Sequence, residues 1–246
     1  MSLYFKQMDI ALIGYGRMGR EVESAAAGFG HSIVLKADVQ QMALSAEDLQ
    51  KADVVIEFTE PASAVDNIYK CFDANVPVVV GTTGWYDRLA DVKQRCLETD
   101  QCLLYASNFS IGMNLFFSIN AALAKRMDKW AEYDVDVNET HHIHKLDAPS
   151  GTAITLAEQI LYGLKRKKSW VKGRSDKSDE LEVHSKREGE VPGTHIVRYD
   201  SDVDDITIRH EAKSRKGFAL GAVRAAEWVQ GKKGFFTMAD MLGLDH

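Results

Sequence analysis

The residues whose types are best suited to catalysis or ligand binding stand directly before a predicted helix in the middle of the chain. They are His141, His142, His144 and Lys145. The helix begins at Pro149-Ser150-Gly151-Thr152, where Ser150 has a side chain suited to cap an N-terminus. The backbone N–H groups of the next two residues are then free to bind a carboxylate. Histidines and a cation beside such a site favour both anion binding and proton delivery.

Two other interpretations of the histidines stay open. They could form a metal site, although the run holds no cysteine and the carboxylates close by are Glu139 and Asp147. They could also be satisfied by hydrogen bonds inside a network at the end of a strand. We expect no bound metal and favour a site for a small anion.

A second group of residues predicts a dinucleotide site. Gly14-Tyr15-Gly16-Arg17-Met18-Gly19 follows the short apolar segment 9–13 and opens a predicted helix. Glycines in this context permit a tight turn and let backbone N–H groups approach a pyrophosphate at the helix N-terminus. Asp38 ends the next predicted strand about twenty residues on, where an acid can bind a ribose hydroxyl. A purely structural glycine turn is the alternative.

Polar turns follow three further predicted strands. They are Glu57-Phe58-Thr59, Gly81-Thr82-Thr83-Gly84 and Ser107-Asn108-Phe109. Each could be an ordinary turn, but the carboxyl ends of parallel strands share one edge, and that edge lines the ligand crevice of such sheets. The segment 210–219 carries cations and an aromatic residue at the crossing back to a last helix. It could reach the cofactor from the other side, or it could be an ordinary charged linker.

The elements that carry these turns alternate between strand and helix over roughly the first 105 residues. Strands are predicted at 9–13, 32–37, 53–58, 76–80 and 102–105. Helices are predicted at 17–27, from Pro61 and at 87–98. This rhythm is typical of an α/β Rossmann domain, with a doubly wound parallel sheet.

The pattern changes near Ser107. An apolar helix at 113–127 is followed by segments that alternate apolar and polar residues, at 133–137, 181–183, 195–199 and 205–209. The acidic stretch 200–205 reads as a hairpin turn, 172–179 as a loop, and 218–230 as the final helix. Alternation with period two predicts an α+β domain whose mixed sheet is covered on one face.

We therefore expect a dinucleotide-binding domain from residues 1–107 with 216–246, and a domain for substrate binding and oligomerisation from 108–215. Cys71, Cys96 and Cys102 are scattered, which argues against a disulfide scaffold or a zinc ribbon and favours the cytoplasm. A net charge of −6 argues against a nucleic-acid partner, and no apolar run reaches the ~18 residues of a membrane helix.

Taken together, these residues resemble the dihydrodipicolinate (4-hydroxy-tetrahydrodipicolinate) reductase family, and the resemblance covers the chain from Met8. The segment from Glu139 to Ala153 resembles the signature of that family. The segments 107–114, which resembles its interdomain hinge, 187–195 and 234–242 also fit.

The resemblance implies an oxidoreductase that uses NADH or NADPH to reduce 4-hydroxy-tetrahydrodipicolinate to tetrahydrodipicolinate in lysine and diaminopimelate biosynthesis. His141 would be the acid/base residue and Lys145 the proton donor, while His142, Gly151 and Thr152 would hold a small cyclic dicarboxylate. The dinucleotide would contact Gly14, Tyr15, Gly16, Arg17, Met18, Gly19, Asp38, Gly81, Thr82, Thr83, Ala106, Ser107, Asn108, Phe109, Arg215 and Phe218. The family is usually a homotetramer formed by the sheets of the second domain.

The chain departs from the family pattern around the cofactor site. Its glycine turn is one residue tighter than in many members, and the segment between Asp38 and Asp53 is short. Val39 stands where many members have a basic residue after the acid, which predicts a modest preference for NADH. The alternatives are another NAD(P)-dependent dehydrogenase of amino-acid metabolism and a dinucleotide-sensing protein without catalysis.

Overall fold

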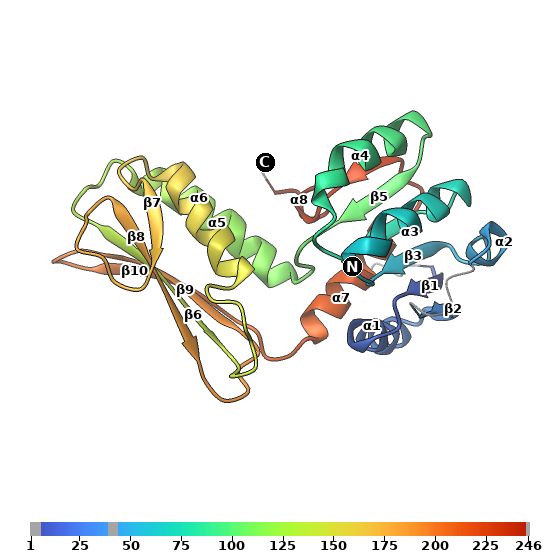
Figure 1. Ribbon diagram of the computed structural model, residues 1–246, viewed down its shortest axis with the longest axis horizontal. Helices are drawn as coiled ribbons and strands as arrows, with labels where there is room; N and C mark the ends of the chain where they lie inside the picture. Colours follow the sequence, from blue (N-terminus) through green and yellow to red (C-terminus); the bar gives the residue numbers. More distant parts are fainter. Residues whose placement is uncertain (1–5, 39–43, 245–246) are drawn as a thin grey trace. The chain divides into compact units, whose positions relative to one another are not determined.

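The computed structural model describes residues 6–38 and 44–244. The chain divides into two compact units, one of residues 1–111 with 216–246 and one of residues 112–215 (Figure 1). No helix among the described residues is long and apolar enough to cross a membrane.

The first unit is built on a sheet of parallel strands. They are β1 (Asp9–Ile13), β2 (Ser32–Ala37), β3 (Val54–Glu57), β4 (Val78–Val80), β5 (Cys102–Tyr105) and β11 (Gly234–Phe236). The order across the sheet is β11-β5-β4-β3-β1-β2, with parallel pairing throughout. The chain thus winds outward from β1 in one direction and from β3 in the other, and ligands of such sheets bind where the direction changes. The predicted Rossmann architecture is confirmed.

Helices cover both faces of this sheet. They are α1 (Arg17–Gly28), α2 (Ala46–Leu49), α3 (Pro61–Asp73), α4 (Leu89–Glu98, after a 3-10 turn at Tyr86–Arg88), α7 (Lys216–Trp228) and α8 (Met238–Leu242). Successive strand residues point to opposite faces. Ile10 and Leu12 therefore pack with α1 and α7, whereas Ala11 and Ile13 pack with α3 and α4. Burial on both faces explains why β1 reads as a continuous apolar run.

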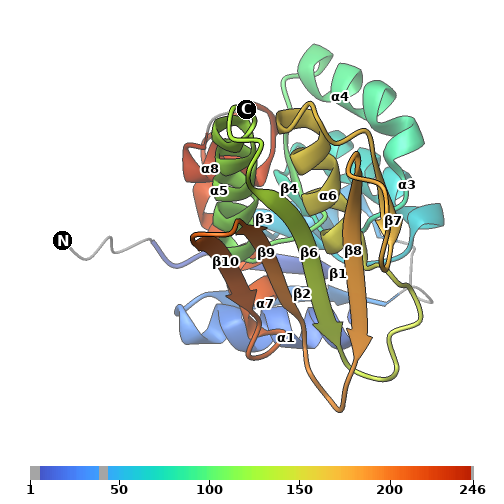
Figure 2. The ribbon, with the colours of Figure 1, turned by 90° about the vertical axis from the view of Figure 1, so that its left-hand side faces the viewer.

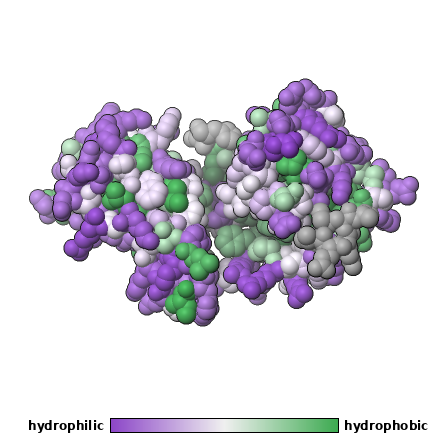
Figure 3. Space-filling view, viewed as in Figure 1, coloured by the Kyte–Doolittle hydropathy of each residue, from purple (hydrophilic) through white to green (hydrophobic). Residues whose placement is uncertain are grey.

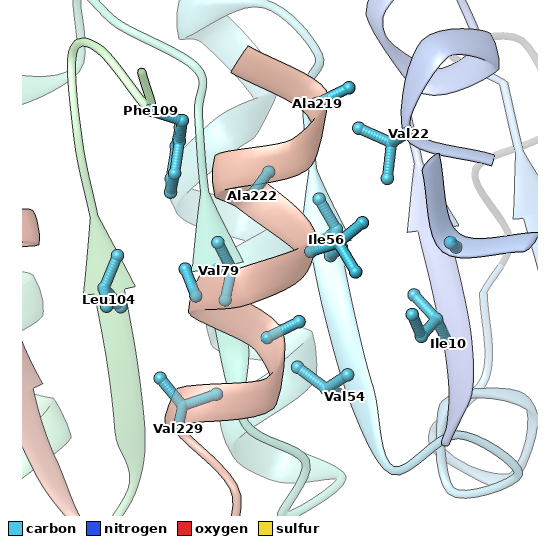
Figure 4. Close-up of a cluster of buried hydrophobic side chains, with 14 of the residues drawn as sticks. Ile10, Val22, Val54, Ile56, Val79, Leu104, Phe109, Ala219, Ala222 and Val229 are labelled. Carbon is cyan, nitrogen blue, oxygen red and sulfur yellow. The ribbon is translucent and has the colours of Figure 1, made fainter. Parts of the chain in front are cut away.

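Helix α7 lies close against the sheet because its inward face carries small residues. Ala219 and Ala222 are fully buried against Ile56 and Val79 of the sheet, and Figure 4 shows the helix crossing these strands. A Cβ atom on Gly221 would lie 1.7 Å from the carbonyl oxygen of Phe109, so only glycine fits there. This contact fixes the start of α7 beside the turn that follows β5.

The second unit holds a mixed sheet of five strands. They are β6 (Asp134–His141), β7 (Ser169–Lys172), β8 (Glu180–Arg187), β9 (Thr194–Asp200) and β10 (Asp205–Glu211). The order is β10-β9-β6-β8-β7, in which β6 pairs parallel to β8 and antiparallel to β9. The acidic stretch between β9 and β10 is a hairpin turn, as the sequence predicted.

Helices α5 (Ile111–Met127) and α6 (Gly151–Gly163) lie together on one side of this sheet; in Figure 2 the strands stand in front of them. Val135, Val137, Leu181 and Val183 point toward the helices and are buried. Burying each such side chain stabilises the fold by about 1.5–3 kcal/mol. The predicted α+β unit with a mixed sheet is confirmed.

Several predicted boundaries were wrong. The helix predicted to be the last is followed by β11 and α8. β7 was not predicted, and β6 extends to His141 rather than ending at Val137. The last difference matters most, because it places Glu139 and His141 on the buried face of a strand.

Candidate active site

The glycine turn after β1 has the geometry that close approach to a pyrophosphate requires. Gly14 adopts φ +95°, and a Cβ atom there would lie 2.0 Å from the carbonyl oxygen of Phe58. A Cβ atom on Gly19 would lie 2.4 Å from the carbonyl oxygen of Gly14. Gly16, by contrast, is the N-cap of α1, and among the described residues, its own chain neighbours aside, no atom lies within 4 Å of its Cβ position and no side chain caps the helix. The N-terminus of α1 is thus open toward an anion.

Asp38 follows β2 directly, next to the glycine turn. The backbone N–H of Gly14 donates to the carbonyl oxygen of Ala37 at 2.8 Å, which brings the ends of β1 and β2 together. The neighbouring Val39, on which the predicted cofactor preference partly depends, lies outside the described residues.

A lysine near this turn forms an ion pair with a glutamate that was not predicted from the sequence as part of the site. Lys36 Nζ lies 2.5 Å from Glu23 Oε1 and 3.3 Å from Tyr15 Oη, and Tyr15 Oη also donates to the Glu23 carboxylate. The hydrogen bond from Lys36 lowers the pKa of Glu23, and the same bond raises the pKa of Lys36. Both groups are therefore charged at neutral pH, and the lysine charge is already balanced.

The polar turns after β3 and β4 meet at one edge of the sheet, as predicted. Thr82 Oγ1 accepts from the backbone N–H of Thr59 at 2.7 Å. The Phe58 ring leaves no room for a Cβ atom on Gly81, which would lie 2.0 Å from it. Beneath these turns Glu57 is fully buried, and burial raises the pKa of its carboxyl, against hydrogen bonds from Thr59, Thr82 and Asn67.

The turn after β5 joins this edge through its aromatic residue. The Phe109 ring packs edge-on to Phe58 with centroids 5.8 Å apart. Phe218 lies in the first turn of α7, the helix that packs on Phe109. Arg215 is exposed and belongs to the second unit. Ala106, Ser107, Asn108 and Thr83 lie in the turns themselves.

In the second unit, the predicted anion site begins with α6. Ser150 is its N-cap, and Ser150 Oγ accepts from the backbone N–H of Ala153 at 3.2 Å, which confirms the predicted cap. Gly151 is exposed and Thr152 half-buried at the first turn. Their N–H groups stand at the positive end of a thirteen-residue helix, which is a favourable place for a carboxylate.

The loop that precedes α6 presents Lys145 beside this helix start. Lys145 Nζ lies 2.8 Å from Asp147 Oδ1, and this hydrogen bond lowers the pKa of Asp147. Arg187 of β8 donates to the carbonyl oxygens of Lys145 and Asp147 and so holds the loop against β8. His142 is half-buried, and its carbonyl oxygen accepts from the N–H of Lys145 at 3.1 Å.

The same loop carries exposed apolar side chains. Leu146 is 97% exposed and Ile143 60% exposed. Figure 3 shows hydrophobic surface at the end of the second unit where β6 ends. His144 is also exposed; it pairs with Glu190 at 3.5 Å, and its ring centroid lies 6.1 Å from that of His142.

His141 lies in a buried network at the end of β6. Its Nδ1 contacts Glu139 Oε2, and its ring packs against His195 at 5.1 Å between centroids. Burial would raise the pKa of Glu139, but hydrogen bonds from His141, Ser185 and Arg187 outweigh it and hold that pKa well below its usual range. Burial and the neighbouring His141 lower the pKa of His195 to about 3. Sequence reasoning had missed Arg187 and His195 as members of this site.

Glu139, His141 and His195 are also the described residues whose ligand atoms come close enough to suggest a metal ion. In a tetrahedral zinc site, however, two ligand atoms stand about 3.3 Å apart, given bond lengths of about 2.0–2.1 Å. The Glu139 and His141 atoms are in direct contact and closer than this, as in a hydrogen bond. That geometry does not fit a metal between them, and the absence of a metal stays a prediction.

Comparisons with known proteins identify relatives of both units. Residues 8–109 match the family described as "Dihydrodipicolinate reductase, N-terminus", and residues 112–242 match "Dihydrodipicolinate reductase, C-terminus". A 4-hydroxy-tetrahydrodipicolinate reductase of Christiangramia forsetii is 49% identical over 96% of this chain and 98% of its own length. The protein of the same description from Neisseria gonorrhoeae is 36% identical over 90% of this chain and 81% of its own length.

Solved structures share the fold. A dipicolinate-bound dihydrodipicolinate reductase from Paenisporosarcina sp. TG-14 superimposes with a TM-score of 0.75 at 22% identity, covering 94% of this chain and 98% of its own. An amine dehydrogenase from Mycobacterium smegmatis gives a TM-score of 0.55 at 9% identity, covering 100% of this chain and 98% of its own.

Proposed function

The chain belongs to the dihydrodipicolinate reductase family, and from this membership we propose that it reduces 4-hydroxy-tetrahydrodipicolinate to tetrahydrodipicolinate with NADH or NADPH, in lysine and diaminopimelate biosynthesis. The observation that carries the proposal is 49% identity to a reductase of that description over nearly the whole chain. The site geometry supports it, because Lys145 belongs to the loop that leads into the N-terminus of α6 and pairs there with Asp147.

The two units have separate roles in this proposal. The uncapped start of α1 and the turns after β3, β4 and β5 would hold the dinucleotide, which would supply the hydride for reduction of the substrate ring. The second unit holds the dicarboxylate: the first N–H groups of α6 bind one carboxylate, and His142 and Lys145 neutralise and orient the substrate. Lys145 donates the proton that completes the reduction, and His141 is the acid/base residue. Orientation and charge stabilisation of this kind supply several kcal/mol of barrier reduction.

The proposal is tested with enzymatically generated substrate and both nicotinamide cofactors. We expect oxidation of the cofactor that requires the substrate. Saturable NADH binding without turnover of any cyclic imine would favour the alternative of a dinucleotide-sensing protein.

We propose a modest preference for NADH over NADPH. Asp38 at the end of β2 repels a 2′-phosphate and accepts hydrogen bonds from ribose hydroxyls. Lys36, two residues earlier, and Arg17 are the cations that could compensate, but Glu23 already balances the charge of Lys36. A higher kcat/KM for NADPH than for NADH in the unmodified protein would contradict this preference.

Removing the Glu23 charge is expected to shift the preference toward NADPH. In Glu23→Gln, Lys36 keeps its charge without an ionic partner, and kcat/KM for NADPH should rise roughly fivefold, the scale of an exposed ion pair. kcat/KM for NADH should stay within about twofold. Glu21→Gln is the matched control, because Glu21 lies on the same helix but faces the cavity beside α7. An equal shift in both variants would show that net charge, rather than Lys36, is responsible.

We further propose a cytoplasmic homotetramer assembled through the second unit. Within the residues that the structure describes, both helices of that unit lie on one side of its sheet, which leaves the other side for a partner sheet (Figure 2). The three cysteines are free and buried, as a reducing compartment permits. Sedimentation velocity on the purified protein measures the assembly, and a monomer at micromolar concentration would contradict it.

A further inference from the structure

A buried carboxylate stands at the centre of the second unit's site. The Glu139 side chain is fully buried, and its Oε1 accepts from the backbone N–H of Ser150 and from Arg187 Nη2, both at 3.1 Å. Its Oε2 contacts His141 Nδ1. Burying a charge is unfavourable unless it is paired and hydrogen-bonded. Glu139 meets that condition with partners from β6, β8 and the start of α6, so the group retains its charge.

The contact with Glu139 decides which nitrogen of His141 carries the proton. An ionised carboxylate can only accept hydrogen bonds, so the nitrogen that faces it must carry hydrogen. In neutral His141 that nitrogen is Nδ1, which leaves the lone pair on Nε2. A Cβ atom on residue 193 would lie 3.0 Å from Nε2, and Gly193 leaves that space open.

We propose that Glu139 is a positioning residue: it fixes the proton of His141 on Nδ1 and thereby keeps Nε2 as the atom that exchanges a proton at the substrate site. This inference rests on the proposed function, in which His141 is the acid/base residue. The logic is that of a carboxylate that orients a catalytic imidazole and stabilises its protonated form.

The other titratable and charged groups around His141 do not replace Glu139 in this role. His195 Nε2 lies 3.3 Å from Ser150 Oγ, so this nitrogen is engaged with Ser150 rather than with His141. His210 and Lys145 act on His195 through their charges rather than as hydrogen-bond acceptors for His141. Arg187 donates to Glu139 and to the loop carbonyls, so it links the carboxylate to the Lys145 loop.

The state of the His141 ring can be measured directly by nitrogen NMR. In the unmodified protein we expect hydrogen on Nδ1 and a lone pair on Nε2, with His141→Ala used to assign the signal. Glu139→Gln keeps the size of the side chain. Because Ser150 and Arg187 both donate to one oxygen, the amide oxygen takes that place and the NH₂ group faces Nδ1. The ring hydrogen should therefore move to Nε2.

Measurements of kcat and KM then distinguish a positioning role of Glu139 from a purely structural role. In Glu139→Gln we expect kcat to fall on the order of 10²-fold, while KM stays within about threefold. The double variant with His141→Ala should lose little more than His141→Ala alone, because both changes remove the same interaction. Glu182→Gln is the matched control: it changes a carboxylate 2.9 Å from His184 in the same sheet and should leave kcat unchanged.

Hydrogen on Nε2 in the unmodified protein would overturn the proposal, and this measurement needs no variant to fold. In Glu139→Gln, a His141 ring hydrogen that stays on Nδ1, or a raised KM with normal kcat, would also overturn the proposal. Glu139 would then only anchor α6. If the ring changes as expected while His141→Ala keeps a normal kcat, the positioning stands and the acid/base role of His141 in the proposed function is wrong.

Discussion

Lys145→Ala should lower kcat by about 10²–10⁴-fold, the usual contribution of a general acid, and should also raise KM. The rise in KM follows from the loss of a charge-assisted bond to the substrate carboxylate, worth roughly 1.5–3 kcal/mol. An interaction used only for binding in the ground state would raise KM and leave kcat unchanged. Steady-state kinetics with NADH and enzymatically generated substrate distinguishes the two cases.

The structure explains why the lysine is suited to this task. Asp147 accepts from Lys145 Nζ at 2.8 Å, which keeps the side chain directed along the loop. Because the hydrogen bond from Lys145 lowers the pKa of Asp147, this carboxylate stays ionised at neutral pH and is an anionic partner for the lysine. A lysine in the loop that leads into a helix N-terminus can both bind a carboxylate and act as a proton donor.

Two further measurements identify what a loss of activity means. NADH affinity, followed by fluorescence, should hardly change in Lys145→Ala, because the dinucleotide is proposed to bind the other unit. Lys186→Ala is the matched control: Lys186 lies on β8 in an exposed pair with Glu188 and should leave kcat unchanged. Near-normal kcat in Lys145→Ala would leave this lysine with a binding role alone. A loss of NADH affinity would show that the loop binds the cofactor rather than the substrate.

The sequence predicts the first unit better than the second, because the sequence patterns that specify the first unit are local. The apolar run 9–13, the glycine turn and Pro61 each specify a structure within a few residues, and the structure has all three. The cap at Ser150 was predictable for the same reason. β11 was not, because three residues form a strand there only by pairing with Cys102–Leu104, more than a hundred residues away.

The end of β6 shows why the buried network escaped prediction. Hydrophobic alternation stops at Val137, yet the inward positions 139 and 141 continue the pattern with polar residues. The burial of Glu139 is possible because Arg187 and Ser150 donate to its carboxylate, and both partners come from outside β6; His141 in turn contacts Glu139. Periodicity detects apolar side chains that face a core, but it cannot detect polar residues whose partners are distant in the sequence.

Gly14→Ala is expected to destabilise the protein by roughly 3–5 kcal/mol, among the largest effects of a single substitution. The added Cβ atom would lie 2.0 Å from a backbone carbonyl oxygen, which cannot move aside as a side chain can, and φ +95° is unfavourable for alanine. Urea denaturation followed by circular dichroism measures the change.

Gly16→Ala provides the contrast that separates the structural role of the turn from its binding role. Gly16 has φ −81°, and no atom of the other described residues beyond its chain neighbours lies within 4 Å of its Cβ position, so the free energy of unfolding should change by no more than about 0.5 kcal/mol. The new methyl group would instead occupy the space through which a pyrophosphate approaches the start of α1, and NADH affinity should fall at least tenfold. If Gly16→Ala bound NADH normally, the pyrophosphate would not lie on this turn. If Gly14→Ala were as stable as Gly16→Ala, the close approach of Gly14 to Phe58 would not be a constraint on the fold.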